Sequence, residues 1–428
     1  MDNILEFKVD SMRSDVHEII SLDLINFNGQ SISLKDLFSE ISLQESIFLP
    51  FCSGYITVLE SHNVFEDLPI TGEETLKISY KGLHSDIIDR EFYVYSLSTA
   101  ASEIGAMAAH KLMFCSYETM INKSKRVSRA FTNMTPSNVI KAIVRTELDS
   151  KKDVHVEDST NTVNYISPNV TPFAIAASMA PRAHNAAIPS GGLYLFYESA
   201  DGFNFRSIES LLDGDTFNYK ISEQGLGDNV FNDDSIVLKH SFVSPINTVN
   251  NITSGVMGNN IQMLDLDNRT MSSAGFDYFD DAQYKSVKKI ERGDPESRFV
   301  SSNFKLKTTQ GINAVMVGTD VTRDATIGRR QNRLATLKSG PRVHIEVPIN
   351  FAMRAGSLIK LHMPTRLVID NKLKTDDVFL TGVYLVTACR HIFSQHSGTT
   401  AIELVKDSYA VKRDDPTILK DGMERLGL

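Results

Sequence analysis

Two blocks of strand-like sequence, near opposite ends of the chain, constrain its fold more than any other feature. Alternation of apolar and polar residues with a period of two is typical of a half-buried strand. In the first block it is clearest at residues 17–26, and strand-like runs follow at 54–60, 75–80, 91–96 and 111–117. Five or more strands within about 100 residues indicate a small barrel or sandwich. The second block has such runs at 342–347, 358–361, 378–389 and 399–405.

The segment between the blocks carries helical signals. Thr135-Pro136 and Thr171-Pro172 each place a threonine N-cap before a proline at the first helical position. Asp201-Gly202 lies between two strand-like runs and favours a hairpin, because both residues tolerate positive φ. We therefore predict an α+β domain over residues 126–235.

The rest of the chain completes the predicted domain order. Strand-like runs at 236–240 and 261–266, and a helical run at 329–338 that ends at Gly340-Pro341, indicate a β-rich and helical connecting domain. A chain of 428 residues is long enough for two to four domains. The predicted domains are a first β domain at 1–125, the α+β domain at 126–235, the connecting domain at 236–338, a second β domain at 339–410 and a polar tail at 411–428.

The two β blocks resemble each other locally. In the first, Gly72-Glu-Glu-Thr-Leu-Lys-Ile78 precedes strand-like runs near 92–95 and 112–116. In the second, Gly356-Ser-Leu-Ile-Lys-Leu361 precedes runs near 383–387 and 400–404. A glycine turn that leads into three successive strands therefore occurs twice, which is a weak signal alone because many β proteins share it.

Composition and charge argue against several classes of protein. No run approaches the roughly 18 uninterrupted apolar residues of a transmembrane helix. The first residues lack the basic start and apolar stretch of a secretory signal, so we expect synthesis in a cytoplasm. The net charge of −9 argues against sequence-independent nucleic-acid binding but allows DNA to pass without sticking. Cys52, Cys115 and Cys389 have no Cys-x-x-Cys spacing and are predicted to be buried thiols.

Catalytic and metal-binding motifs are missing from the sequence. It contains neither Gly-x-Ser-x-Gly nor His-Glu-x-x-His. Residues 72–77 lack the spacing of a phosphate-binding loop, and residues 213–215 fail the calcium-loop pattern because Phe217 occupies a ligand position. His391 and His396 are five apart in a β region, which suits no metal pair. We predict no catalytic, cofactor-binding or metal-binding residue, and expect the protein not to be an enzyme.

Three stretches carry a resemblance to a known family. The first comprises residues 47–50, 54–61 and 63–78, where a hydrophobic run ends in Leu-Pro-Ile and a Gly-Glu turn leads into a strand. The others are 253–269 with 276–278, and 354–361 with the strands that follow. In this order they resemble the baseplate hub proteins of contractile-tailed bacteriophages, over roughly residues 15 to 410.

The resemblance implies a fold and a role. It implies a mainly β chain with α+β insertions, in which the two β blocks are similar small barrels of the tail-tube type. It implies a homotrimer that forms a ring with pseudo-sixfold symmetry, connects the tail tube to the central spike and lets DNA pass. The partners implied are the spike, the tube or tube-initiator protein, the tape measure and other baseplate proteins, and the location is the virion. No cofactor is implied.

Nine positions are predicted to shape the turns and strands of the two β blocks. They are Gly54, Pro69, Gly72, Leu76, Ile78, Gly356, Leu358, Ile359 and Leu361. Two other functions stay open at this point. One is a hub or spike component of another contractile injection machine, such as a type VI secretion apparatus. The other is a cell-wall hydrolase, which would need a pair of positioned carboxylates.

Overall fold

The structure is a computed structural model, which describes a large part of the chain. The described residues are 16–60, 70–82, 85–101, 108–185, 193–221, 235–243, 249, 253, 258–265, 269–277, 301–307, 330, 333–338, 340–364, 368–369, 372–373, 377 and 380–406.

The first β unit contains seven strands. They are β1 (His17–Ile25), β2 (Ser31–Ser33), β3 (Phe38–Ser46), β4 (Ser53–Glu60), β5 (Thr75–Gly82), β6 (Ile88–Ala101) and β7 (Ala108–Cys115). Their order in the sheet is β3-β4-β7-β6-β5-β1-β2, and all neighbours are antiparallel. The alternation predicted for β1 is confirmed, since Leu22 and Leu24 are buried on one face.

The second β unit combines strands from two distant parts of the chain. They are β13 (Thr216–Ile221), β14 (Ile236–Val237), β15 (Lys239–Phe242), β19 (Arg342–Pro348), β20 (Leu358–His362), β23 (Gly382–Phe393) and β24 (Gly398–Val405). The central order is β13-β20-β23-β24-β19-β15. The adjacent short strands β14 and β15 bond to β13 and β19 respectively, so the unit curls nearly into a ring.

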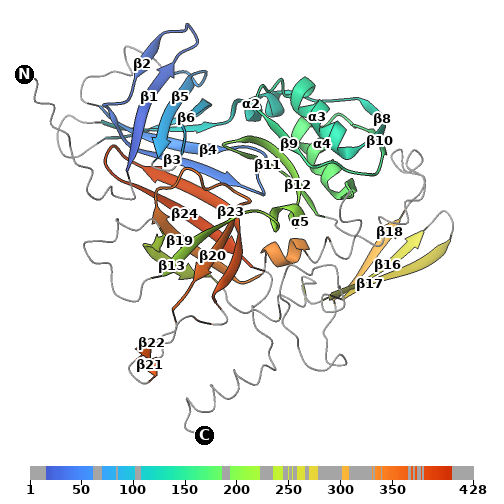
Figure 1. Ribbon diagram of the computed structural model, residues 1–428. Helices are drawn as coiled ribbons and strands as arrows, with labels where there is room; N and C mark the ends of the chain where they lie inside the picture. Colours follow the sequence, from blue (N-terminus) through green and yellow to red (C-terminus); the bar gives the residue numbers. More distant parts are fainter. Residues whose placement is uncertain are drawn as a thin grey trace, which may run out of the picture.

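The two units form one 14-stranded sheet, because β3 of the first pairs with β23 of the second (Figure 1). Two similar β units are therefore present, as predicted, but the expectation of two separate closed barrels needs correction. Within the described residues no ladder closes either unit completely. The physical reason in the first unit is that the edge of β3 that could close it is already bonded to β23.

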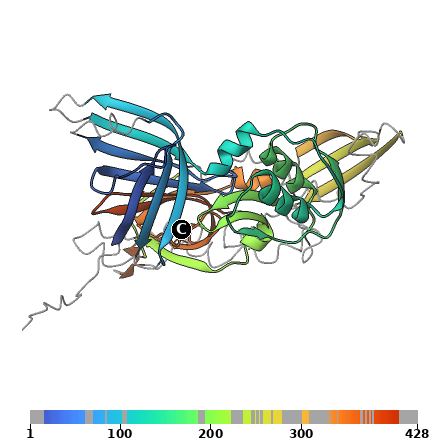
Figure 2. The same ribbon diagram turned by 90° about the horizontal axis from the view of Figure 1, so that it is seen from above.

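The α+β region lies beside the sheet (Figure 2). Its elements are α2 (Tyr117–Ser124), β8 (Ala130–Met134), α3 (Pro136–Ala142), η1 (Ile143–Glu147), β9 (Val154–Val156), β10 (Val163–Ile166), α4 (Pro172–Met179), η2 (Ala180–Arg182), β11 (Tyr194–Ser199), β12 (Gly202–Ser207) and α5 (Ile208–Leu211). Both predicted caps are confirmed, because Thr135 and Thr171 accept hydrogen bonds from the third residue of their helices. The predicted hairpin joins β11 to β12 at Gly202, where φ is +122°.

A small three-stranded sheet projects from the other elements (Figure 1). β16 (Gly258–Asp265), which contains most of the strand-like run predicted at 261–266, forms an antiparallel pair with β17 (Thr270–Asp277), and β18 (Ser301–Lys307) adds to β16 in parallel. A two-residue pair, β21 (Val368–Ile369) and β22 (Lys372–Leu373), lies near the second unit. Residues 333–338 are helical, within the run predicted at 329–338.

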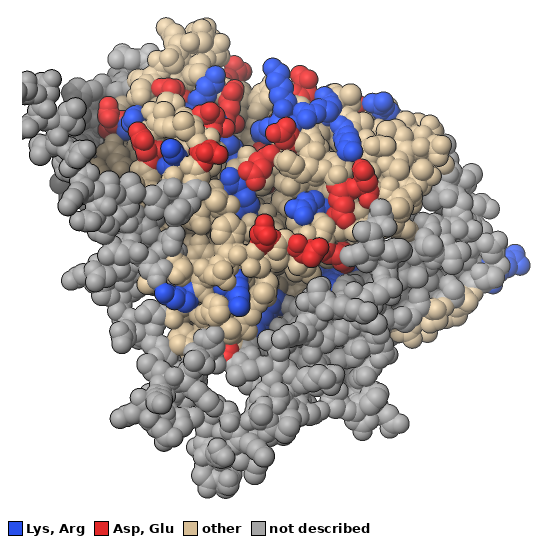
Figure 3. All heavy atoms as spheres, viewed as in Figure 1, with Lys and Arg blue, Asp and Glu red and all other residues tan. Residues whose placement is uncertain are grey.

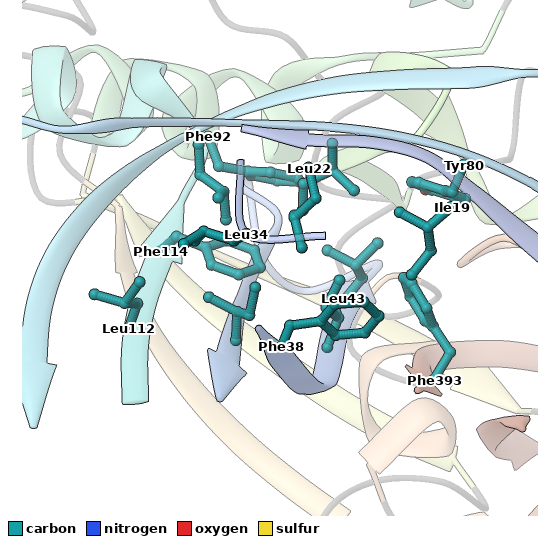
Figure 4. Packing of buried hydrophobic residues seen from close by; sticks show 14 of the residues in the cluster. Ile19, Leu22, Leu34, Phe38, Leu43, Tyr80, Phe92, Leu112, Phe114 and Phe393 are labelled. Atoms are coloured by element: carbon teal, nitrogen blue, oxygen red, sulfur yellow. The ribbon is translucent and has the colours of Figure 1, made fainter. Parts of the chain in front are cut away.

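The hydrophobic core of the first unit takes side chains from both units. Leu22, Phe92 and Phe114 come from its own strands (Figure 4). Phe351 and Phe393 come from the second unit and pack against the same cluster, where Phe351 lies 4.5 Å from Tyr80 between ring centroids. Burying a large apolar side chain stabilises a fold by about 1.5–3 kcal/mol. The side chains that the second unit contributes to this core therefore couple the stability of the two units.

Candidate functional site

The two β units repeat the same five-strand arrangement. In the first unit the order is β3-β4-β7-β6-β5, and in the second it is β15-β19-β24-β23-β20. Equivalent strands also follow one another in the same order along the chain. Every neighbouring pair in both sets is antiparallel. A shared topology of this kind identifies a structural duplication within the chain.

A β-bulge at the same place strengthens this duplication. The β6–β7 register shifts between Val94 and Ser96, and the β23–β24 register shifts between Val386 and Ala388. Bulges re-aim a strand at a defined position and are not random defects. The amide of Val94 also donates to Glu74 O at 2.9 Å, as the amide of Val386 donates to Ser357 O at 2.9 Å.

These registers make individual residues equivalent. Leu76 and Ile78 oppose Phe92 and Arg90 on β6, as Ile359 and Leu361 oppose Tyr384 and Gly382 on β23. Leu76, Ile78, Ile359 and Leu361 are all buried, and so is Leu358. The similarity between the segments that begin at Gly72 and Gly356 therefore reflects a real structural repeat.

The predicted glycines serve different purposes. Gly72 and Gly356 have φ of +94° and +92°, a region that favours glycine. A Cβ on Gly54 would lie 2.0 Å from Ser42 O and 2.8 Å from the Phe114 ring, so this position needs glycine for the close approach of β3, β4 and β7. Pro69 lies outside the described residues.

The seam between β3 and β23 unites the two units. Six residue pairs, from Ser46 with Ala388 to Ile41 with Phe393, form its antiparallel ladder. The amide of Ile47 continues it by donating to Thr387 O at 3.0 Å. Ser42, Ser46 and Thr387 are buried along the seam, and Ser46 Oγ donates to Thr387 O at 3.2 Å.

A buried cluster of charges lies next to this seam. Arg90 on β6 lies 3.8 Å from Glu45 on β3 and 3.8 Å from Glu198 on β11. Lys152 Nζ extends the cluster, at 2.8 Å from Glu198 and 2.6 Å from Glu118 on α2. The two cations thus connect the first β unit to the α+β region, and each carboxylate has a charged partner, as buried charges require.

The electrostatics of the cluster follow from burial. Burial raises the pKa of Glu45, while the charges of Arg354 and Arg90 act in the opposite direction. Burial alone would lower the pKa of Arg90, but neighbours that include Glu198 and Glu45 raise it above its ordinary value. Arg90 is therefore a permanent cation in the middle of the molecule.

The cysteines near this cluster are buried, as predicted. Burial raises the pKa of Cys52 and Cys389 well above the ordinary value and raises that of Cys115. Because the thiolate is the reactive form, these thiols behave as apolar side chains in this environment.

Sequence reasoning missed this cluster and the strand that forms the seam. The signal available was a set of ionisable residues inside apolar runs, such as Glu198 directly after residues 193–197. The run at 38–46 carries so many serine and glutamate residues that it does not alternate as a half-buried strand does, although Ser42, Glu45 and Ser46 are all buried.

Other kinds of site find no support in the described part of the chain. No group of three or more His, Cys, Asp and Glu side chains there could hold a metal ion. No helix among the described residues is long and apolar enough to cross a membrane. On the face shown in Figure 3, basic and acidic side chains are interspersed, and this pattern does not resemble the continuous basic surface typical of a nucleic-acid binder.

Comparisons with known proteins agree with this architecture. No protein-family model matches the chain. It is 23% identical over 234 residues to the probable baseplate hub protein gp334 of Vibrio phage KVP40, a match that covers 53% of this chain and 55% of that protein. The chain thus spans about half the length of the curated relative it matches.

Two solved structures share the fold. One is a 43 kDa tail protein of prophage MuSo2 from Shewanella oneidensis, with a TM-score of 0.57 at 11% identity, covering 92% of this chain and 100% of that one. The other is a tail protein from Neisseria meningitidis, with a TM-score of 0.56 at 10% identity, covering 90% and 96%. The chain has the fold of these phage-type tail proteins and is similar in sequence to a probable baseplate hub protein.

Proposed function

We propose that this protein is a structural baseplate hub of a contractile phage tail, forming a trimeric ring that connects the tail tube to the central spike. The duplicated five-strand unit carries this proposal. Three chains with two equivalent units each present six similar units, so a threefold assembly can match a sixfold tube on one side and a threefold spike on the other. Closed rings of this kind restrict how the subunit surfaces can repeat.

The proposed partners follow from this position in the tail. They are two further copies of the chain, the spike protein, and the tube or tube-initiator protein, with the tape measure and other baseplate proteins nearby. DNA passes through the ring as cargo. The protein is then a virion component made in the host cytoplasm, and its interfaces in the ring bury at least about 2,000 Å².

The domain boundaries proposed from the sequence fit this role. The β domains at 1–125 and 339–410 supply the ring, together with β13, β14 and β15, which complete the second β unit, and the remaining parts of the segments at 126–235 and 236–338 decorate it. β13, near the end of 126–235, pairs with β20 of the second β domain and thereby links the two.

A structural role fits the buried carboxylates better than hydrolysis does. A glycoside hydrolase needs two carboxyl groups that face the substrate and a water molecule. Glu45 and Glu198 instead face Arg90, and Glu198 also accepts a hydrogen bond from the amide of Cys52 at 3.0 Å. Their arrangement is that of an internal ion cluster.

Light scattering on the purified chain, alone and mixed with the neighbouring spike protein, tests the proposal. The expected mass is three times 47.6 kDa for the chain alone, or three times 47.6 kDa plus the mass of the bound spike if the trimer forms only after the spike is added. A chain that stays monomeric in both samples would contradict a trimeric hub.

A further inference from the structure

One edge of β23 has two partners along its length. Residues 382–385 pair with β20, and residues 388–393 of the same edge pair with β3. The other edge of β23 pairs with β24. β23 of the second unit therefore has hydrogen-bonded neighbouring strands on both edges along most of its length.

The equivalent strand of the first unit is β6, which has a partner along only part of the corresponding edge. Residues 88–93 of β6 pair with β5, as residues 382–385 of β23 pair with β20. Beyond them, residues 96–101 pair with β7 on one edge and with no strand of the described part of the chain on the other. Figure 2 shows this end of β6 projecting beside its neighbouring strands.

Burial differs accordingly at equivalent positions. Thr387 and Cys389 on β23 are 0% and 1% exposed, because β3 and its neighbours cover them. Their counterparts on β6 are Tyr95 and Leu97, which are 47% and 39% exposed. Exposed large apolar residues on an unpaired strand edge mark a surface that another strand can cover.

The duplication also identifies the strand that would cover this edge. The counterpart of β3 is β15, since β3 pairs with β4 as β15 pairs with β19. Three of the four residues of β15 are exposed, from Lys239 to Ser241, whereas Ile41 and Ser42 of β3 are buried. The amide of Val243 bonds to Arg342 on β19, so the peptide groups of His240 and Phe242 face away from β19.

We propose that β15 of one chain pairs antiparallel with residues 96–101 of β6 in the next chain, as β3 pairs with β23 inside each chain. This proposal rests on the trimeric ring proposed above and adds the strands that join its subunits. Three seams within chains and three seams between chains would then alternate around the ring.

The register of the β3–β23 seam within the chain also predicts the register of the proposed β15–β6 seam between chains. Arg390 opposes Gln44 within the chain. Their counterparts are Ser98 on β6 and Val243 directly after β15, so Ser98 lies opposite Val243 of the neighbouring chain. Both side chains are exposed in the isolated chain, with Val243 at 52%. Directly opposed residues have Cα atoms about 4.5–5.5 Å apart, which suits a disulfide.

Cysteine cross-linking of the full-length chain tests this register. Under mild oxidation, Ser98→Cys with Val243→Cys should give covalent dimers and trimers on a non-reducing gel. The matched control is Ser98→Cys with Ser241→Cys, which moves one cysteine two residues along the strand, to about 7–8 Å from its partner. Little cross-linking is expected in the control, and the three native cysteines are buried in both variants.

The outcomes separate this inference from the proposed function. Trimers by light scattering that do not cross-link in the first variant, or that cross-link equally in both, would overturn the β15–β6 seam and leave the trimeric hub standing. A chain that is monomeric with and without the spike would overturn both.

A second variant tests the seam without new cysteines. Leu97→Asp places a charge at the exposed position that the neighbouring strand would cover, and should shift trimers toward monomers while the circular dichroism spectrum of the folded chain stays unchanged. Val383→Asp is the control, because Val383 is an exposed strand residue of the repeat that lies outside the proposed seam. Equal trimer populations in the two variants would count against the seam.

Discussion

At the scale of single residues, His391 shows how burial decides the chemistry of a side chain. Its ring packs edge-on against Phe351, with 5.4 Å between centroids, and Nδ1 lies 3.0 Å from Thr400 Oγ1. Burial, assisted by the charge of Arg354, lowers the pKa of His391 to about 3. The imidazole is therefore neutral in the folded chain at neutral pH.

This pKa predicts a pH dependence of folding. Between pH 6.5 and about 3 the unfolded chain binds a proton at His391 that the folded chain does not, so folding stability falls as the pH decreases. The loss is about 1.4 kcal/mol for each pH unit, or about 2 kcal/mol at pH 5. Denaturant unfolding at pH 7 and pH 5 measures it.

The control for this measurement is His391→Gln, which does not titrate. The native chain should lose about 2 kcal/mol more than this variant between pH 7 and pH 5. Glu45 has a raised pKa and contributes in the opposite direction, but equally in both proteins. Equal losses in the two proteins would show that His391 is not buried as a neutral group.

At the scale of elements, buried ion pairs hold strands from different parts of the chain in place. Arg90 links β6 to β3 and β11, and Lys152 links β11 to α2. Such pairs contribute little net stability compared with apolar residues of the same shape, but removal of one partner is costly because it leaves an uncompensated buried charge.

We expect Arg90→Met to destabilise the chain by about 3–5 kcal/mol, because Glu45 and Glu198 lose their shared cation. Lys77→Met is the matched control in the same β5–β6 ladder, where Lys77 and Glu91 form an exposed pair at 4.0 Å. It should cost less than about 1 kcal/mol. Denaturant unfolding of both variants measures the difference, and similar values for the two would contradict a structural role for the cluster.

At the scale of the whole molecule, we expect the two β units to fold and unfold as one. Hydrogen bonds cross the β3–β23 seam, and Phe351 and Phe393 of the second unit complete the core of the first. A seam with a shared core makes the two units unfold together, in contrast to domains joined by a flexible linker.

We expect Phe351→Ala to cost about 3–5 kcal/mol and to weaken both units equally. Hydrogen exchange followed by mass spectrometry reports on β5 and β20 separately, so it distinguishes shared from separate unfolding. The free energy of exchange should fall by the same amount in both strands. A fall confined to β20 would show that the units unfold independently.

Much of the local structure could be predicted from sequence patterns. The alternation at residues 17–26, the threonine caps at Thr135 and Thr171 and the Asp201-Gly202 turn all depend on neighbours within a few residues. The glycine-led segments at Gly72 and Gly356 gave a weak signal of the repeat, which the strand order then established. Each of these features is encoded by the preferences of adjacent residues, so a single sequence is sufficient to identify it.

Only the tertiary structure decided which strands are neighbours and which charges are buried. The polar run at 38–46 became the seam strand β3, and β13 pairs with β20, which lies more than 100 residues later in the chain. Glu45, Arg90 and Glu198 meet inside the molecule although they lie on three distant strands. Alternation specifies which face of a strand is buried, but the partner strand is chosen by packing between residues that are far apart in the sequence.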